Sequence, residues 1–341
     1  MRRRSRSPTA TPPSPPWFED LPVGTVFTAA PALTLSEGHA ALHQAIAGDR
    51  LRLALDRTLA EAVAGAGPPL AHPALVWDAA IGQSTVATGR VVANLFYRGL
   101  LLRRPVRLGD TLRTTTEVVA RRENRVKEGR RPTGLALLRI RTVDQQERPV
   151  LDFTRCAMLP LGGEPTGEPG DEVGGAADLE AGALQAAAAG LDLGAYRAAV
   201  PGPHFDAVPD GWGLEIEGGD VVDSAPALAR LTVNAAMAHL DAGSTADGRR
   251  LVYGGHAIGL AAGQAARALP SLVTILGWHG CDHTAPVFEG DTLRSRIELE
   301  RREPLPDGGG LLHLRSRVAA ARADGGEDAE VLDWRFVAVL A

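Results

Sequence analysis

Residues 249–262, RRLVYGGHAIGLAA, decide the fold of this chain. An apolar run leads to the pair Gly254-Gly255, and small or aliphatic residues then follow at helical spacing. The pattern predicts a strand or loop that delivers the chain to a helix with an almost bare first turn. Backbone N–H groups at the start of a helix lack partners within it, so a carbonyl oxygen can approach them closely. We therefore expect a small-molecule site at the beginning of this helix.

This stretch belongs to the second copy of an internal repeat. Residues 105–113 (PVRLGDTLR) recur as residues 286–294 (PVFEGDTLR), an offset of 286 − 105 = 181. Residues 18–24 (FEDLPVG) are echoed by residues 205–211 (FDAVPDG), an offset of 205 − 18 = 187. Two separate matches at similar offsets imply two copies of one unit.

The repeat divides the chain into four parts. Residues 1–16 are rich in Arg, Ser and Pro and are expected to form a disordered tail. Residues 17–160 form the first unit, residues 161–203 a linker with an alanine-rich helix, and residues 204–341 the second unit, which we expect to be the catalytic half.

Each unit is predicted to hold a short helix, a variable loop, a long apolar helix and a set of antiparallel strands. A helix that is apolar on nearly every side must be enclosed, so we expect the sheet to wrap around it in an α+β fold. The expected helices are 36–47, 75–87, 224–231 and 255–269, and the expected strands are 112–119, 135–143, 150–159, 293–299, 311–319 and 329–340.

Composition narrows the function. The 341 residues are 45% hydrophobic with a net charge of −5, which supports a proper core and gives no support for nucleic-acid or membrane binding. No apolar run approaches the ~20 residues of a membrane span, and the basic N-terminus lacks the apolar segment of a secretory signal. Cys156 and Cys281 could form one disulfide at most, and a reduced, cytoplasmic setting is the simpler interpretation.

The order of elements and motifs resembles the MaoC-like hydratases and dehydratases. This family has a double hotdog fold, in which two antiparallel sheets, each wrapped around a central helix, form an intrachain pseudo-dimer. The resemblance runs from Trp17 to the last strand and is greatest to the subgroup of mesaconyl-CoA hydratases, also called β-methylmalyl-CoA dehydratases. It rests on residues 250–256 (RLVYGGH), 283–284 (HT), 288–292 (FEGDT), 92–95 (VANL), 105–106 (PV) and 109–111 (GDT).

The resemblance implies a water-activating pair, an Asp followed five residues later by a His. In the second copy His239 matches the His, whereas Asn234 stands in place of the Asp. An amide cannot accept a proton at neutral pH, so acid–base work would fall on His239, with Asn234 orienting His239 or the water. A loop histidine held by a backbone carbonyl is the alternative for His239.

The first copy also lacks a complete pair. Asp49 matches the Asp, but Ala54 stands at the His position. The first copy is therefore expected to be a structural partner that shapes the acyl or CoA pocket. Two alternatives remain for Asp49, namely pairing with a His across the pseudo-dimer and an ordinary turn aspartate beside Arg50.

The resemblance also implies that Gly254 and Gly255 bind the thioester oxygen. A glycine pair that only allows close packing of the helix is the alternative. Four further substrate-binding candidates surround the pair, and His256 among them could face either the site or the sheet. These candidates are His256, His283, Arg250 and Tyr253.

His279, Cys281 and His283 alternate along a probable strand, so they are expected to share one face. Zinc ligation is an alternative without an evident fourth ligand, and we predict no metal. Cys281 could act as a nucleophile or be a small buried residue.

A CoA thioester needs cations for its phosphates, and a dicarboxylic acyl group needs one for its free carboxylate. The candidates are Arg98, Arg103, Arg104, Arg249 and Arg250.

The sequence thus predicts a hydro-lyase acting on a branched α,β-unsaturated acyl-CoA of the mesaconyl type. CoA enters as part of the substrate and no other cofactor is implied. Two alternatives are a thioesterase of the same fold and a catalytically inactive acyl-binding homologue. A monomer is viable, and pairing into a homodimer is compatible with the fold.

Overall fold

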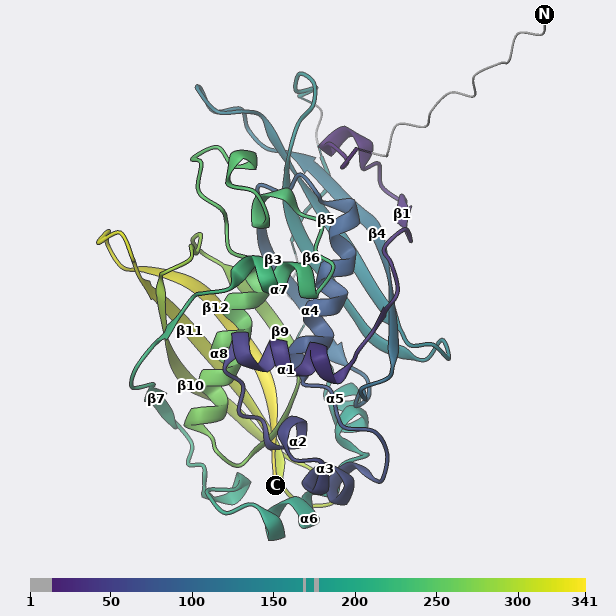
Figure 1. Cartoon of the computed structure of the whole chain (residues 1–341), viewed down its shortest axis with the longest axis vertical. Helices are drawn as coiled ribbons and strands as arrows, with labels where there is room; N and C mark the ends of the chain where they lie inside the picture. Colours follow the sequence, from purple (N-terminus) through teal and green to yellow (C-terminus); the bar gives the residue numbers. More distant parts are fainter. Residues whose placement is uncertain (1–13, 168–169, 175–177) are drawn as a thin grey trace, which may run out of the picture.

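The computed structural model describes residues 14–167, 170–174 and 178–341, and the first thirteen residues of the expected tail lie outside these ranges. Within them, twelve strands form one continuous antiparallel sheet in the order β1-β4-β5-β6-β3-β9-β12-β11-β10-β7, with β2 paired to β4 and β8 to β10. Figure 1 shows the two halves of this sheet, each curving around one long helix. The α+β class and the double hotdog arrangement are therefore confirmed.

The strands are β1 (Val26–Phe27), β2 (Leu33–Thr34), β3 (Ala93–Leu102), β4 (Thr111–Glu123), β5 (Thr133–Val143), β6 (Pro149–Pro160), β7 (Gly213–Glu215), β8 (Asp220–Val221), β9 (Leu272–His283), β10 (Thr292–Pro304), β11 (Gly310–Ala321) and β12 (Ala329–Leu340). The α-helices are α1 (Glu37–Ala47), α2 (Arg52–Leu55), α3 (Arg57–Ala64), α4 (Pro73–Ser84), α5 (Ala181–Ala188), α6 (Leu193–Ala199), α7 (Ala225–Leu231) and α8 (Gly254–Ala268). Short 3-10 helices lie at Phe18–Asp20, Thr85–Ala87, Phe205–Ala207, Met237–His239 and Ala242–Ser244.

A pseudo-two-fold axis relates the two copies where β3 pairs with β9. Leu101 lies opposite Gly277 in this pairing. Adding 181 to the first number and subtracting 181 from the second gives Asp282 and Phe96, which also lie opposite each other. The offset found in the sequence is therefore the symmetry operation of the fold.

The two long helices lie in the core. Every residue of α4 is buried, as are residues 255–266 of α8. Pro73 suits the first turn of α4 because its missing N–H would have no partner there. Trp77 of α4 packs edge-to-face on Trp278 of β9 with ring centroids 4.9 Å apart, which ties the two copies together.

Several elements differ from the expectation. The variable loop of the first copy contains α2 and α3, and the linker contains α6 as well as the expected alanine-rich helix α5. Strand β3 was not predicted, because its short run of apolar residues lacks regular alternation.

Cys156 and Cys281 are both buried and free. None of the helices in the described ranges combines the length and apolarity of a membrane span.

Candidate active site

His239 ends the 3-10 helix Met237–His239 and is 8% exposed. Its Nδ1 lies 2.9 Å from the carbonyl oxygen of Leu251. A proton on Nδ1 satisfies that carbonyl and leaves the lone pair on Nε2. Burial lowers the pKa of His239 to about 4, so the imidazole is neutral at pH 7 and can accept a proton.

The first copy supports the loop that carries His239. The N–H of Ala235 donates to the hydroxyl of Thr85 at 2.7 Å, and the N–H of Met237 donates to the carbonyl of Gly89 at 2.9 Å. A Cβ on Gly82 would lie 1.9 Å from the carbonyl oxygen of Thr232, so the loop rests directly on α4. The position of His239 therefore depends on both copies.

Each glycine at the start of α8 accommodates a polar side chain. A Cβ on Gly254 would lie 2.7 Å from the His283 ring, and a Cβ on Gly255 would lie 2.1 Å from Oδ1 of Asp78. Gly254 therefore lets the helix lie close to the sheet at the end of β9, and Gly255 lets it lie close to Asp78 of α4. Binding of a thioester oxygen by this pair stays a prediction.

Asp78, from the middle of α4, forms a buried network that the sequence analysis missed. Its Oδ1 accepts from the Tyr253 hydroxyl at 3.1 Å, and its Oδ2 lies 3.1 Å from Nε2 of His43. Burial, with Asp78 next in importance, raises the pKa of Tyr253 well above its usual range. The Tyr253 ring lies 5.7 Å from that of His239, so the network reaches the second-copy loop.

The other predicted histidines lie in the same interior. His283 is half-buried beside Gly254, with its Nε2 atom buried and its ring 5.8 Å from that of Tyr97. His256 is 0% exposed and neither ring nitrogen has a hydrogen-bond partner in the described part of the chain. Burial lowers the pKa of each to about 4. Both side chains are therefore neutral at pH 7.

Asn234 does not replace the missing aspartate directly. Its Oδ1 accepts from the N–H of Ala236 at 2.9 Å, which stabilises the turn leading to His239. Its Nδ2 is buried, and no partner for it occurs among the residues described. The side chain thus shapes the loop and leaves one donor unused.

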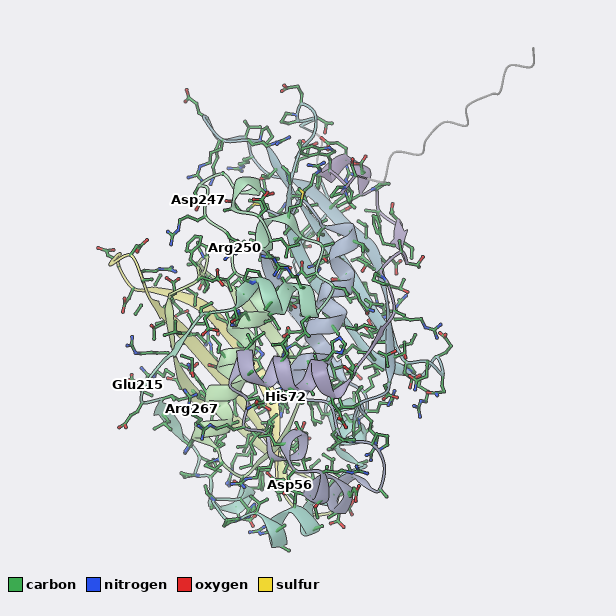
Figure 2. The ribbon with its side chains drawn as sticks, viewed as in Figure 1. Asp56, His72, Glu215, Asp247, Arg250 and Arg267 are labelled. Atoms are coloured by element: carbon green, nitrogen blue, oxygen red, sulfur yellow. The ribbon has the colours of Figure 1, made fainter. Side chains whose placement is uncertain are left out.

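Asp49 is a turn aspartate, because its Oδ1 accepts from the N–H of Leu51 at 2.9 Å, but its histidine partner does not lie across the pseudo-dimer. It lies 2.8 Å from Nε2 of His72 in its own copy, and both side chains are buried. His72 in turn caps α4 by accepting from the N–H of Ala74 at 2.9 Å. In Figure 2 His72 lies below α1 and Arg250 lies above α7, well apart in this view.

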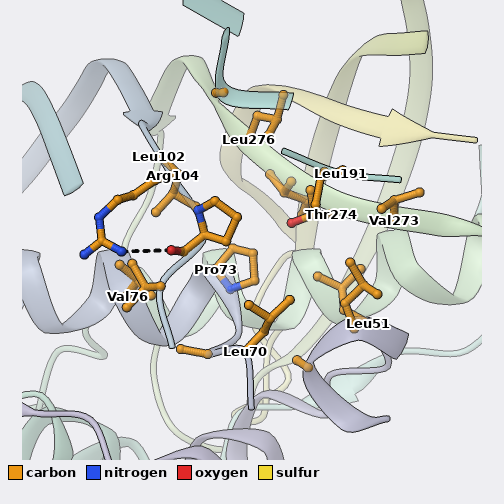
Figure 3. Close-up of a pocket in the computed structure, with 17 residues that line it drawn as sticks. Leu51, Leu70, Pro73, Val76, Leu102, Arg104, Leu191, Val273, Thr274 and Leu276 are labelled. Carbon is orange, nitrogen blue, oxygen red and sulfur yellow. Dashed lines mark hydrogen bonds between the residues drawn. The ribbon is translucent and has the colours of Figure 1, made fainter. Parts of the chain in front are cut away.

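An apolar pocket with a cavity volume of about 50 Å³ lies close to this pair. Figure 3 shows Leu51, Leu70, Pro73 and Leu102 on its wall. The offset of 181 relates Pro73 to Gly254 and Leu102 to His283. The pocket therefore occupies the place in the first copy that the His239 site occupies in the second.

The expected shared face is confirmed for Cys281 and His283 but is wrong for His279. On β12, Arg335 pairs with Gly280 and the next residue pairs with Trp278, so His279 forms a bulge. The bulge turns His279 toward Leu179 and His313, whereas Cys281 joins the core and His283 packs on Gly254. His279 is thereby separated from the other two side chains. Within the described ranges, no group of three or more His, Cys, Asp or Glu is placed to hold a metal ion.

Most of the arginine candidates are ion-paired. Arg250 binds Glu289, Arg98 binds Asp282, Arg104 binds Asp144 and Asp110, and Arg249 binds Asp324 and covers the Phe288 ring. Arg103 is exposed.

Arg155 on β6 was not among the candidates, yet it is 3% exposed and lies within electrostatic reach of His239. A lone charge inside the segments PALVWDAAIG and FTRCAML is the sequence signal that could have revealed Asp78 and Arg155.

Comparisons with known proteins agree with this geometry. No protein-family model matches the chain. It is 30% identical over 310 residues to mesaconyl-CoA hydratase of Cereibacter sphaeroides, covering 88% of each chain. It is 26% identical over 344 residues to β-methylmalyl-CoA dehydratase of Chloroflexus aurantiacus, covering 95% of this chain and 96% of that one. A conserved hypothetical protein of Mycobacterium tuberculosis with a double hotdog fold superposes with a TM-score of 0.86 at 52% identity, over 96% of this chain and 98% of that one.

Proposed function

The chain belongs to the MaoC-like hydratases and dehydratases, and we propose that it adds water to, or removes it from, an α,β-unsaturated acyl-CoA thioester. The names of the two curated relatives support a branched acyl group of the mesaconyl-CoA and β-methylmalyl-CoA type. CoA is part of the substrate in this proposal.

The chemistry follows from two groups, the neutral imidazole of His239 and the N-terminus of α8. Nε2 of His239 takes a proton from water while the water oxygen bonds to the β-carbon. The electron pair of the double bond moves toward the thioester oxygen, which the N-terminus of α8 at Gly254 stabilises. The imidazolium of His239 then returns its proton to the α-carbon, so every atom of the water ends in the product. Dehydration is the same path in reverse.

The observation that carries the proposal is the buried position of His239 and the contact of its Nδ1 with the Leu251 carbonyl. A histidine whose pKa is lowered to about 4 by burial is ready to accept a proton at pH 7. Its Nδ1 is occupied by the Leu251 carbonyl, which fixes Nε2 as the reactive nitrogen. His283 and the start of α8 lie in the same interior.

The test is the loss of ultraviolet enoyl-thioester absorbance with mesaconyl-CoA. We expect His239→Gln to lower kcat about 100-fold or more, because general acid–base catalysis contributes about that much. His279→Gln is the matched control, since His279 is buried but bonds His313 outside the site. Wild-type rates in H239Q would remove His239 from the mechanism.

Two other outcomes would replace the proposal. Release of free CoA thiol from a saturated acyl-CoA would indicate a thioesterase. Tight acyl-CoA binding without turnover of any enoyl-CoA would indicate an inactive homologue, an outcome that Asn234 makes relevant because the amide lacks a carboxylate's basicity.

The free, buried thiols of Cys156 and Cys281 support a reducing compartment such as the cytoplasm.

A further inference from the structure

Arg155 is the only arginine or lysine buried in the described part of the chain, at 3% exposure. No carboxylate oxygen of the described residues lies within the 4.0 Å of an ion pair from its nitrogens. Its Nη2 donates to the Ser84 carbonyl at 3.3 Å and to the Thr88 hydroxyl, while its Nε has no partner among these residues. A buried cation without an anion is costly, so the position is explained if an anion arrives with the substrate.

The partners of Arg155 place it beneath the loop of the second copy. Ser84 and Thr88 are the chain neighbours of Thr85 and Gly89, which hold the N–H groups of Ala235 and Met237. His239 lies two residues after Met237 in the chain. These contacts place Arg155 beside the loop that carries His239, and its positive charge contributes, after burial, to the lowered pKa of His239.

The sheet brings Arg155 to the other side chains of the site as well. On β3, Tyr97 lies directly opposite Arg155, and the Tyr97 ring contacts that of His283. The Arg155 guanidinium and the Tyr253 hydroxyl also interact electrostatically. Arg155 thus lies among residues of both copies that surround the proposed reaction centre.

We propose that Arg155 binds the free carboxylate of a dicarboxylic acyl group and so selects fumaryl-type thioesters over simple enoyl thioesters. The inference rests on the proposed function for its reaction but not for its binding step. A fumaryl-type acyl group carries its free carboxylate on the β-carbon, the atom to which water adds. A guanidinium next to His239 is where that carboxylate has to lie, and it can accept two parallel N–H bonds there.

Buried donors without partners add to the fit. Nε of Arg155 and Nδ2 of Asn234 are both buried and lack a hydrogen-bond partner in the described residues. Both are donors, and a carboxylate offers only acceptors. An apolar acyl group would leave them unsatisfied. This first-copy arginine therefore gives the N-terminal half a direct role in choosing the substrate.

The first experiment compares hydration of mesaconyl-CoA and crotonyl-CoA by the wild type, Arg155→Met and Arg155→Lys. We expect R155M to lose about 100-fold more in kcat/KM for mesaconyl-CoA than for crotonyl-CoA, because a site built to hydrogen-bond a group discriminates strongly for it. R155K should recover part of the preference because it restores a charge but not the bidentate fork. Arg139→Met is the matched control, since Arg139 is held by Asp152 on the sheet.

The second experiment needs no turnover. Succinyl-CoA and butyryl-CoA are saturated and differ by the free carboxylate, and calorimetry gives the affinity of each. We expect the wild type and R139M to bind succinyl-CoA at least tenfold more tightly and R155M to show no preference.

The outcomes separate the two proposals. Equal losses for both substrates in R155M, or a wild type that does not prefer succinyl-CoA, would assign Arg155 a purely structural role. A wild type that prefers succinyl-CoA yet hydrates no enoyl-CoA would uphold the carboxylate site and overturn the proposed function. If R155M does not fold, R155K and the wild-type preference still decide.

Discussion

Replacing Gly255 with alanine tests the contact between the two central helices. The added methyl carbon would lie 2.1 Å from Oδ1 of Asp78 and 2.4 Å from the Tyr253 ring. Moving the Asp78 side chain costs free energy, because α4 is buried along its whole length and the Asp78 carboxylate contacts His43 and Tyr253, each at 3.1 Å. The substitution therefore has to displace the carboxylate from one or both partners.

The expected cost has three parts. Forcing a methyl group into a packed interior costs about 1–3 kcal/mol. Losing a buried hydrogen bond to a charged group costs about 1.5–3 kcal/mol. Alanine returns up to about 1 kcal/mol through its higher helix propensity. We therefore expect Gly255→Ala to lower the free energy of unfolding by about 2–5 kcal/mol.

Urea unfolding of two glycine variants measures this cost against a matched control. Gly182 occupies the second position of α5, as Gly255 does in α8, and a Cβ there would meet nothing within 4 Å. Gly182→Ala should leave stability unchanged or raise it by up to about 1 kcal/mol. In an Asp78→Ala background, Gly255→Ala should cost much less because the clashing oxygen is gone. Equal stabilities for G255A and G182A would refute the close contact between α8 and Asp78.

Acid should unfold the protein through its buried histidines. Burial lowers the pKa of His239, His256 and His283 from 6.5 to about 4 in the folded chain. Below pH 6.5 these three histidines therefore bind protons in the unfolded chain but stay neutral in the folded chain until the pH approaches 4. The free energy of unfolding should therefore fall as the pH drops from 6.5 to 4, by up to about 1.4 kcal/mol per pH unit for each histidine. Urea unfolding at a series of pH values measures this slope, and His256→Leu should reduce it. A free energy of unfolding that does not change with pH would contradict the neutral burial of these histidines. Cys156 and Cys281 should resist a thiol reagent at pH 7 until urea is added, because burial raises the pKa of Cys156 to about 11 and that of Cys281 well above its usual range; fast labelling of the folded protein would contradict this.

The duplicated sequence was enough to predict the architecture. Two repeated motifs gave offsets of 181 and 187, and the offset of 181 relates the pairs Leu101–Gly277 and Phe96–Asp282 across β3 and β9. A repeat can be found by comparing letters, and a doubled sheet must bury both central helices. The predicted strands lie within β4, β5, β6, β10, β11 and β12, which differ from the prediction mainly by longer ends.

The polar interior could not be predicted in the same way. Asp78 lies 175 residues before Tyr253 in the sequence, and Arg155 lies 84 residues before His239 (253 − 78 and 239 − 155). Their association depends on how α4 and β6 pack against the second copy, which no local pattern encodes. The bulge at His279 is a similar case, because one extra residue reverses the face of every side chain beyond it.

The two half-sites have diverged in a way that favours one reaction centre in each chain. Gly254 begins α8 in the second copy, and Pro73 begins α4 at the equivalent position of the first copy. Gly254 has a backbone N–H at this helix start, whereas Pro73 has none. The residue equivalent to His283 in the first copy is Leu102, which lies on the wall of an apolar pocket. The first copy has thus lost a donor and an imidazole at its own half-site, but it contributes Asp78, Tyr97 and Arg155 to the other. Because those three side chains sit on α4, β3 and β6, the second copy alone would hold His239 without the groups that surround it, and neither half is expected to be active when separated.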